Sequence, residues 1–366
     1  APPTAARVAP TPIAHVLLFV SKGMGLIPRR TFSMATLAAL ACTPPVRAAT
    51  PELRVLTHSS FNLPKPLLAE FERVAGVRLQ LIKGGDAGEM LNKLILTRAK
   101  PIADVVFGID NALWHKAHAA NVLDTYDGPA ARRPSVAEVG AGVVPVTYGF
   151  VNLNADKAWL AREKRSAPTT LMDLTRPEWA GKLVVPNPAT SSPGLAFLLA
   201  TVGGMGDEAA FAWWARMRAN GLKVVKGWSE AYYTEFTRNG GTRPIVVSYA
   251  TSPAAEVFYS KTKLSEPPTA SLSLPGAVFR QVEGVALVKG GKQRAAAEKF
   301  VEFMRSPAVQ TAMQTEMWMY PAEAGVAKAD AFRFAPEPTA FNAPSDADIA
   351  AKGSDWVARW TKVVLK

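Results

Sequence analysis

The sequence predicts an α/β protein. Short, nearly continuous apolar runs alternate along the chain with stretches that carry apolar residues every three or four positions. Runs of the first kind are typical of strands buried on both faces of a parallel sheet, and stretches of the second kind are typical of amphipathic helices. The chain has 366 residues and 48% hydrophobic content, which is enough for a sizeable core and favours two domains over one.

The first part of the fold shows this alternation most clearly. Strands are expected at residues 53–57, 78–82 and 103–108, and helices at 64–74 and 89–99. The segment 84–88 has the sequence Gly-Gly-Asp-Ala-Gly and is expected to form a loop, because these residues favour turns.

The remaining elements follow the same logic. Strands are expected at 143–152, 183–186, 244–249 and 281–288, and helices at 194–202, 207–219, 294–304 and 346–364. Asp207 is a suitable N-cap and Gly221 a suitable helix stop. The last helix carries four apolar residues on one face, namely Trp356, Val357, Trp360 and Val363.

The first 49 residues are predicted to direct export. Met24 is followed by Arg29-Arg30, the apolar run 34–42 and the small residues up to Ala49. This order is typical of a secretory signal, and the run is too short to span a bilayer. We expect 1–23 to be an upstream extension, 24–49 to be a signal peptide cleaved after Ala48 or Ala49, and the product to be periplasmic. A longer signal that includes 1–23 is the alternative.

Cys42 is the only cysteine and lies inside the predicted signal. The mature chain therefore has no disulfide, no thiol nucleophile and no cysteine metal ligand. The sequence Ala-Leu-Ala-Cys that ends at Cys42 resembles a lipoprotein cleavage box, but Ala39 stands where the box usually has an aliphatic residue. A soluble periplasmic product is therefore favoured over a lipid-anchored one.

The charge pattern argues against nucleic-acid binding. The net charge is +12, and residues 1–49 contribute five basic residues and no acidic ones. The mature part keeps a charge of +7, and its basic residues are dispersed rather than clustered in a Lys/Arg block. In a nucleic-acid-binding protein, the basic residues would be clustered on one surface.

Large aromatic residues mark the candidate binding site. Trp228, Tyr249 and Trp318 stand at the ends of apolar runs, beside Gly, Ser and Pro, and lack a helical rhythm. Aromatic faces held at strand or loop ends suit a flat or cationic small ligand, because the ring quadrupole attracts positive charge.

The sequence contains no recognisable catalytic or metal-binding motif. It contains no GxSxG elbow, no P-loop and no GxGxxG. His115 and His118 are three residues apart, but no acidic residue stands between them. We therefore expect no catalytic residue, no metal and no cofactor.

Four segments in order carry a family resemblance. They are Asn-Pro-Ala-Thr-Ser-Ser-Pro-Gly at 187–194, Lys-Gly-Trp-Ser-Glu-Ala-Tyr at 226–232, Ser-Tyr-Ala-Thr-Ser-Pro at 248–253, and Trp-Met-Tyr-Pro at 318–321. Through them the chain resembles the thiamine-binding proteins of bacterial ABC importers, which are two-lobed type II periplasmic binding proteins. The resemblance covers residues 52–360, nearly the whole mature chain.

The resemblance implies two lobes, each a mixed sheet flanked by helices, with the ligand in the cleft between them. Segments 50–148 and 272–315 would form one lobe, and segments 149–265 and 318–366 the other. The implied function is non-catalytic: a monomer captures thiamine or thiamine phosphates by lobe closure and passes the ligand to an ABC permease in the inner membrane.

Other functions of this fold remain open from the sequence. Binders of ferric ion, polyamine or phosphonate are same-fold alternatives, and a secreted enzyme that uses the cleft is an alternative of another class. Thiamine-cleaving enzymes of similar architecture resemble one another in using a cysteine nucleophile, which the mature chain lacks. Ferric-ion binders use adjacent tyrosines. Tyr232-Tyr233 is such a pair, but on an expected helix, where neighbouring side chains diverge.

The resemblance also implies the ligand contacts. Trp228, Tyr249 and Trp318 would pack against the ligand, although each could instead be a core or hinge aromatic. Asp86 would neutralise the thiazolium or accept from the pyrimidine amine, and its alternative role is to form a turn. Ser191 precedes a helix and would hold a hydroxyl or phosphate tail, or simply cap that helix.

Two positions depart from the family pattern. His58 stands where relatives commonly have a tyrosine after the first strand, and Ala255 stands where they have one after the Ser-Pro-Ala turn. His58 is expected to contact the ligand, since an imidazole can still stack, but more weakly when it is neutral. Phe258 or Tyr259 could replace the ring missing at Ala255. Asp110 and Asn111 follow a predicted strand and could also face the cleft.

Overall fold

The computed structural model describes residues 49–366. The predicted extension 1–23, Cys42 and all of the predicted signal except Ala49 lie outside the described residues. Between residues 49 and 366, no helix combines the length and the apolar character needed to cross a membrane.

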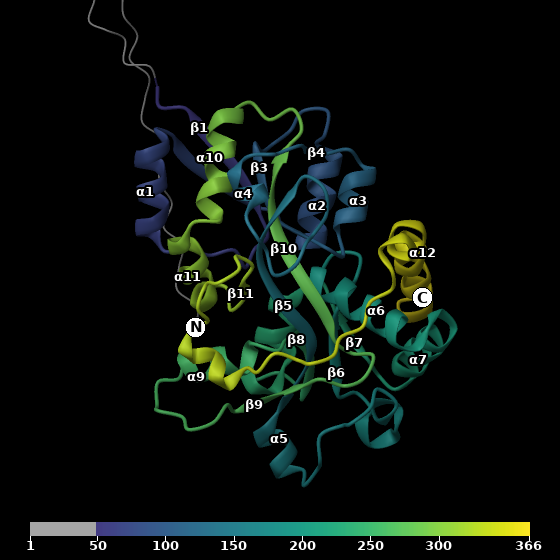
Figure 1. Ribbon diagram of the computed structural model, residues 1–366. Coiled ribbons are helices and arrows are strands. Elements are labelled where there is room, and N and C mark those ends of the chain that lie inside the picture. The colour runs from purple at the N-terminus through teal and green to yellow at the C-terminus, as the bar shows by residue number, and fades with distance from the viewer. Residues whose placement is uncertain (1–48) are drawn as a thin grey trace, which may run out of the picture. The chain divides into compact units, whose positions relative to one another are not determined.

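Eleven strands of the described chain form one mixed sheet (Figure 1). They are β1 (Glu52–Thr57), β2 (Arg78–Lys83), β3 (Val105–Asp110), β4 (Leu123–Asp124), β5 (Val143–Asp156), β6 (Leu183–Pro186), β7 (Lys223–Val225), β8 (Ile245–Tyr249), β9 (Thr269–Leu272), β10 (Phe279–Val288) and β11 (Tyr320–Pro321). The main order is β2-β1-β3-β10-β5-β8-β6-β7.

Helices cover both faces of this sheet. They are α1 (Lys65–Ala75), α2 (Ala87–Leu96), α3 (Trp114–Ala119), α4 (Pro129–Arg132), α5 (Lys157–Arg162), α6 (Ser192–Met205), α7 (Asp207–Ala219), α8 (Trp228–Glu230), α9 (Ser252–Phe258), α10 (Arg294–Met304), α11 (Pro307–Glu316) and α12 (Asp346–Val364). Shorter turns are the 3-10 helices η1 (Asp173–Thr175), η2 (Pro177–Trp179), η4 (Thr237–Asn239) and η5 (Asp330–Phe334), and the π-helix η3 (Ala231–Glu235).

Strands β1, β2 and β3 run parallel, and successive residues of β1 point to opposite faces. Val55 packs with Phe71 of α1 and Phe300 of α10, whereas Leu56 packs with Met90 of α2 on the other face. Figure 1 shows α1 and α10 on one side of these strands and α2 and α3 on the other. Burial on both faces explains why β3 is a nearly continuous apolar run, whereas the edge strand β2 alternates apolar with polar residues.

The 14-residue strand β5 joins the two ends of the sheet. Its residues Val143 to Val151 pair antiparallel with β10, and Val151 to Ala155 pair antiparallel with β8. Strand β11 adds to its edge at Thr147 and Tyr148. The strands beyond β8 run parallel again, because β6 pairs in parallel with both β8 and β7.

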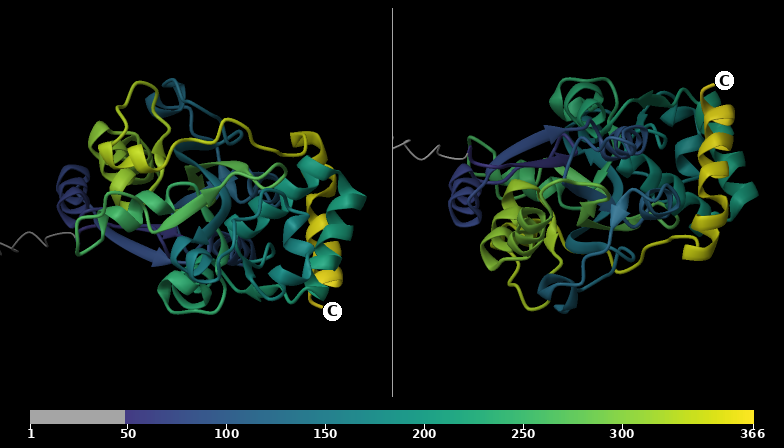
Figure 2. Two further views of the ribbon diagram at one scale, coloured as in Figure 1. Left: turned by 90° about the horizontal axis from the view of Figure 1, so that it is seen from below. Right: turned by 90° about the horizontal axis from the view of Figure 1, so that it is seen from above.

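Helices α6, α7 and α12 cover the β6–β8 end of the sheet. All residues of α6 from Ser192 to Val202 are buried, and α7 packs between α6 and α12. Figure 2 shows the yellow helix α12 along the outside of the teal helices in both views, where it contacts α7. Trp360 of α12 is buried edge-on to Trp214 of α7, with ring centroids 5.5 Å apart. The C-terminal helix predicted at 346–364 is therefore confirmed, together with its buried tryptophans.

Local capping shifts some boundaries from the predicted ones. Helix α2 begins at Ala87 rather than Glu89, because the Asp86 carboxylate accepts the backbone N–H of Ala87 and caps the helix. Asp207 lies inside α7 as its first residue, so its prediction as N-cap is wrong. Gly206, with φ of +79°, takes that position instead. Gly221, with φ of +77°, ends α7 as expected.

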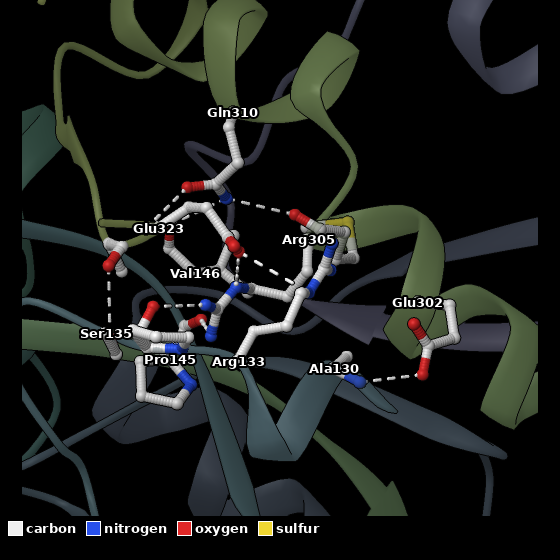
Figure 3. Close-up of polar contacts among 12 residues, drawn as sticks. Ala130, Arg133, Ser135, Pro145, Val146, Glu302, Arg305, Gln310 and Glu323 are labelled. Atoms are coloured by element: carbon white, nitrogen blue, oxygen red, sulfur yellow. Dashed lines mark hydrogen bonds and ion pairs between the residues drawn. The ribbon is translucent and has the colours of Figure 1, made fainter. Parts of the chain in front are cut away.

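A buried arginine ties the helices after β10 to the start of β5 (Figure 3). Arg305 is fully buried, and its guanidinium contacts Glu323 at 2.7 Å and the carbonyl oxygen of Pro145 at 3.0 Å. Gln310 of α11 donates to the Val146 carbonyl at 2.9 Å from the same side. These contacts fix the position of β5 just before Thr147 and Tyr148, which pair with β10 on one edge and with β11 on the other.

Candidate functional site

A cavity of ≈ 590 Å³ lies where the carboxyl ends of several strands meet. His58 follows β1, Asp86 follows β2, Trp228 follows β7, and Tyr249 ends β8. The carboxyl ends of strands in open α/β sheets are the usual place for a ligand. A volume of this size suits a small organic molecule.

Three aromatic rings form one wall of the cavity. The rings of Trp228 and Tyr232 stack with centroids 5.3 Å apart and planes 21° apart. Tyr249 meets Trp228 edge-on at 6.3 Å. The indole N–H of Trp228 donates to the Ser248 hydroxyl at 2.8 Å, and the Tyr249 hydroxyl donates to the Gln281 side chain at 3.0 Å. These hydrogen bonds fix the orientation of the Trp228 and Tyr249 rings.

A second aromatic group stands at the cavity around Trp318. Its ring meets those of Phe258 and Tyr259 edge-on, with ring centroids 5.2 Å and 5.7 Å apart. Its indole N–H donates to the Tyr259 hydroxyl at 3.4 Å. Trp318 adopts φ of +57°, which is uncommon for a residue with a side chain and costs conformational energy.

Tyr259 lines the cavity four residues after Ala255, one helical turn along the chain. Its ring is 63% exposed, so it is accessible to a ligand. Phe258 does not line the cavity. Of the two rings predicted to replace the one missing at Ala255, only Tyr259 therefore lies where it could do so.

Carboxylates face the aromatic wall. Asp86 accepts the backbone N–H of Ala87 at 2.7 Å and that of Trp228 at 2.8 Å, so one carboxylate caps α2 and also holds the tryptophan loop. Glu283 of β10 also lines the cavity, and its oxygen lies 3.0 Å from His58 Nε2. The burial of Tyr249 together with the charges of Glu283 and Asp86 raises the pKa of its phenol well above 10. The Tyr249 hydroxyl therefore stays protonated.

Asp110 forms a buried network behind the cavity. Its carboxylate accepts from the Ser192 hydroxyl and, at 2.8 Å, from the Gln281 side-chain amide. It also accepts the backbone N–H groups of Ala112 and Leu113. Burial is the main reason that the pKa of Asp110 is raised to about 7, while the Ser192 hydrogen bond opposes that rise.

The basic groups at the cavity are already paired. The Arg238 guanidinium contacts Glu256 at 3.1 Å, and the other oxygen of Glu256 accepts from the Tyr232 hydroxyl at 2.8 Å. His58 lies beside Glu283. Among the described lining residues, Arg238 and His58 are the only basic side chains, whereas Asp86, Glu256, Glu283 and Glu316 are acidic. The cavity therefore favours a cation.

The structure brings five of the six predicted contact residues to this cavity, namely His58, Asp86, Trp228, Tyr249 and Trp318. Ser191 does not line it. Ser191 is fully buried, and its hydroxyl accepts the Gly194 N–H as the N-cap of α6, while the neighbouring Ser192 faces the cavity. Of the two roles expected for Ser191, the hydrogen bonds show the helix-capping one.

Asp110 and Asn111 also lie away from the cavity lining. Asn111 uses its side chain to bind the Arg280 carbonyl and the Val282 N–H of β10.

Sequence reasoning missed several lining residues, most clearly Gln281 and Glu283. Both are buried in β10, in a run that is apolar from Gly284 onward. A charged residue inside such a run is a signal in itself, because burying a charge is costly unless a partner or a ligand compensates. Tyr232 and Tyr233 both line the cavity, and the Tyr232 hydroxyl is engaged by Glu256. Among residues 49–366, no group of three or more His, Cys, Asp or Glu side chains could hold a metal ion.

Comparison with known proteins identifies the family. The family model of bacterial extracellular solute-binding proteins matches residues 100–352. The thiamine-binding periplasmic protein of Escherichia coli is 33% identical over 336 residues, which cover 89% of this chain and 97% of that protein. The alignment therefore includes almost the whole of the Escherichia coli protein.

Solved structures agree with the sequence relatives. A periplasmic thiamin binding protein aligns with a TM-score of 0.76 at 30% identity, over 86% of this chain and 96% of that one. A ferric binding protein from Campylobacter jejuni aligns with a TM-score of 0.67 at 17% identity, over 85% of this chain and 99% of that one, and supports the fold alone. The predicted α/β class and type II periplasmic binding protein fold are confirmed. The chain belongs to the bacterial extracellular solute-binding proteins, in the family of periplasmic thiamine-binding proteins.

Proposed function

We propose that this protein captures thiamine, or a thiamine phosphate, outside the cytoplasm and delivers it to a membrane permease without chemically changing it. The observation that carries this proposal is the meeting of Trp228, Tyr249 and Asp86 in one cavity from three separate segments. The relatives named for thiamine binding support the choice of ligand.

The chemistry of thiamine fits the cavity. Its thiazolium ring is a permanent cation, which an aromatic face and a nearby carboxylate both stabilise. Its flat aminopyrimidine offers an amine donor and a stacking surface. The wall of Trp228, Tyr232 and Tyr249 supplies the faces, and Asp86 and Glu283 supply the acceptors. The cavity therefore has an aromatic face for each ring of thiamine and a carboxylate for its charge and its amine.

We propose capture by closure of two lobes, 50–148 with 272–315 and 149–265 with 318–366. Side chains from the two proposed lobes meet beside the cavity. Asp86 accepts the Trp228 N–H at 2.8 Å, and Glu89 contacts Lys226 at 2.8 Å. A ligand held between these elements would favour the closed arrangement, because it contacts both lobes only when they are shut.

The proposed setting is the periplasm, with residues 24–49 as the export signal and an ABC permease of the inner membrane as the partner. The relatives are named as periplasmic proteins, which supports this location. Lipid attachment at Cys42 is a separate outcome, and mass spectrometry of the mature N-terminus distinguishes it from a cleaved soluble product. We propose that the mature protein acts as a monomer.

Calorimetric titration of the purified protein with thiamine, thiamine monophosphate and thiamine diphosphate tests the ligand. We expect saturable binding at micromolar concentrations or below and quenching of tryptophan fluorescence. Absence of binding for all three compounds would refute the proposal. Parallel titrations with ferric ion, a polyamine and 2-aminoethylphosphonate test the same-fold alternatives, and loss of thiamine over time would reveal an enzyme.

A further inference from the structure

His58 and Glu283 form a buried pair of opposite charge inside the candidate cavity. His58 Nε2 lies 3.0 Å from a carboxylate oxygen of Glu283, and both side chains are at least nine-tenths buried. No aligned hydrogen bond satisfies that nitrogen. The imidazole packs so closely against the backbone of β3 that a Cβ on Gly108 would lie 2.6 Å from its Cδ2 atom. His58 is therefore confined beside the carboxylate.

The surroundings favour the charged form of His58. Burial alone would lower its pKa, but the attraction of Glu283, with a contribution from Asp86, outweighs burial and raises the pKa above its ordinary value of 6.5. Lys83 of β2 is the one cation that opposes this rise, and the uncharged Phe107 of β3 packs beside the imidazole. Glu283 is thus paired with a cation that belongs to the protein.

We propose that His58 competes with the bound ligand for Glu283, so that the cavity holds a cationic ligand less tightly when His58 is protonated. This inference rests on the proposed function, because it requires a ligand that carries a positive charge. A cation in the cavity meets Glu283 as a favourable partner and protonated His58 as an unfavourable one. Binding therefore expels the proton from His58.

The direction of the pH effect follows from this competition. At low pH the protein must release a proton before the cation can use Glu283, so the observed affinity falls as the pH falls. At high pH His58 is already neutral and the affinity reaches its maximum. A single competing proton changes the affinity by at most tenfold per pH unit, and we expect about tenfold between pH 8 and pH 6.

Calorimetric titration with thiamine between pH 6 and pH 8.5 tests the proposal, in two buffers of different ionisation enthalpy that report proton release. The range stays above the pH at which the aminopyrimidine takes up a proton. The variant His58→Gln removes the competing charge, and His118→Gln is the matched control. His118 stacks on Trp114 and does not line the cavity.

We expect wild type and His118→Gln to bind more weakly at pH 6 and to release a proton on binding. We expect His58→Gln to show a much shallower pH dependence, with the remainder coming from Asp110 behind the cavity. A flat profile in wild type, or an unchanged slope in His58→Gln, would overturn the competition while leaving thiamine binding intact. Should His58→Gln fail to fold, the absence of proton release by wild type would still refute the proposal. No thiamine binding at any pH would overturn both this inference and the proposed function.

Discussion

The backbone N–H of Trp228 donates a 2.8 Å hydrogen bond to the carboxylate of Asp86, although 142 residues separate them in the sequence. The same carboxylate caps α2 through Ala87. One side chain thus connects the carboxyl end of β2 to the loop after β7, and it places a negative charge beside the aromatic wall. The carboxylate therefore caps α2, and it lies where we propose that it attracts a cationic ligand.

The two roles of Asp86 are separable by mutation. Asp86→Asn keeps an oxygen that can cap α2 but removes the charge, so we expect thiamine affinity to fall about tenfold with little loss of stability. Calorimetry and thermal unfolding measure the two effects. Asp156→Asn is the matched control, because Asp156 caps α5 and does not line the cavity. Equal affinities of Asp86→Asn and wild type would show that the charge does not contact the ligand.

Trp228 should carry a large share of the binding energy. Its ring stacks on Tyr232 and faces the cavity, so Trp228→Ala should weaken thiamine binding by about 1–3 kcal/mol, through lost packing and a lost cation–π contact. Trp228→Phe should also remove much of the fluorescence quenching. Trp356→Phe serves as the control and should leave the quenching intact, because Trp356 of α12 is buried, donates to Asp207 of α7 and does not line the cavity. Undiminished quenching in Trp228→Phe would place the ligand elsewhere.

Trp318 combines a strained backbone with a half-buried ring that lines the cavity. Its φ of +57° is tolerated better by asparagine than by tryptophan, so Trp318→Asn should remove the ring while easing the strain. We expect thiamine affinity to fall about tenfold with only a small change in melting temperature. A matching fall in stability and affinity would mean that Trp318 acts as a packing residue rather than a ligand contact.

Asp110 should make the protein less stable as the pH rises. Its folded-state pKa of about 7 lies above its ordinary value of 3.8, so the folded state keeps a proton that the unfolded state loses. Between these two values, the free energy of unfolding should fall by up to ~1.4 kcal/mol per pH unit from this group.

The variant Asp110→Asn tests this assignment. It removes the titrating group, so its free energy of unfolding should depend less steeply on pH than that of wild type. Urea denaturation at pH 5, 6 and 7 provides the measurement. The raised pKa of His58 acts in the same direction, because stability gained from a protonated histidine is lost on deprotonation, and His58→Gln isolates that part. Identical slopes in Asp110→Asn and wild type would contradict the raised pKa.

Arg305 should be a stability residue without a role in binding. Arg305→Met would leave the Glu323 carboxylate without its closest partner and the Pro145 carbonyl without its donor, which should cost about 3–5 kcal/mol. The control Arg294→Met breaks exposed ion pairs with Glu298 and Asp124 and should cost less than about 1 kcal/mol. Chemical denaturation of both variants measures the difference, and similar losses would show that burial of the Arg305 network adds nothing.

Local sequence patterns gave most of the secondary structure. The alternation of apolar runs and helical periodicity predicted β1 to β3, β6 and β8, and the helices α1, α2, α6 and α7, within a few residues. Asp86 illustrates the limit of this reasoning. Its position among glycines predicted a loop but not the cap that starts α2 two residues early. Whether a side chain caps a helix depends on its rotamer, which sequence patterns do not specify.

The sequence predicted some residues of the candidate site and missed others. Trp228, Tyr249 and Trp318 stood out because large aromatics at strand ends lack a helical rhythm. Glu283 did not stand out, because it lies in the middle of β10, where only the tertiary structure shows that it faces His58 at 3.0 Å. The same holds for Ser191 and Ser192, since one residue of register decides which hydroxyl caps α6 and which faces the cavity.

The sequence by itself determined the α/β class, the order of the elements and the aromatic residues able to serve a cationic ligand, because periodicity and residue chemistry are local properties. Only the tertiary structure decided which acidic groups stand opposite those rings, and that His58 lies against Glu283. Charges interact through space, and the pairing of β10 with both β3 and β5 brings together residues that lie far apart along the chain.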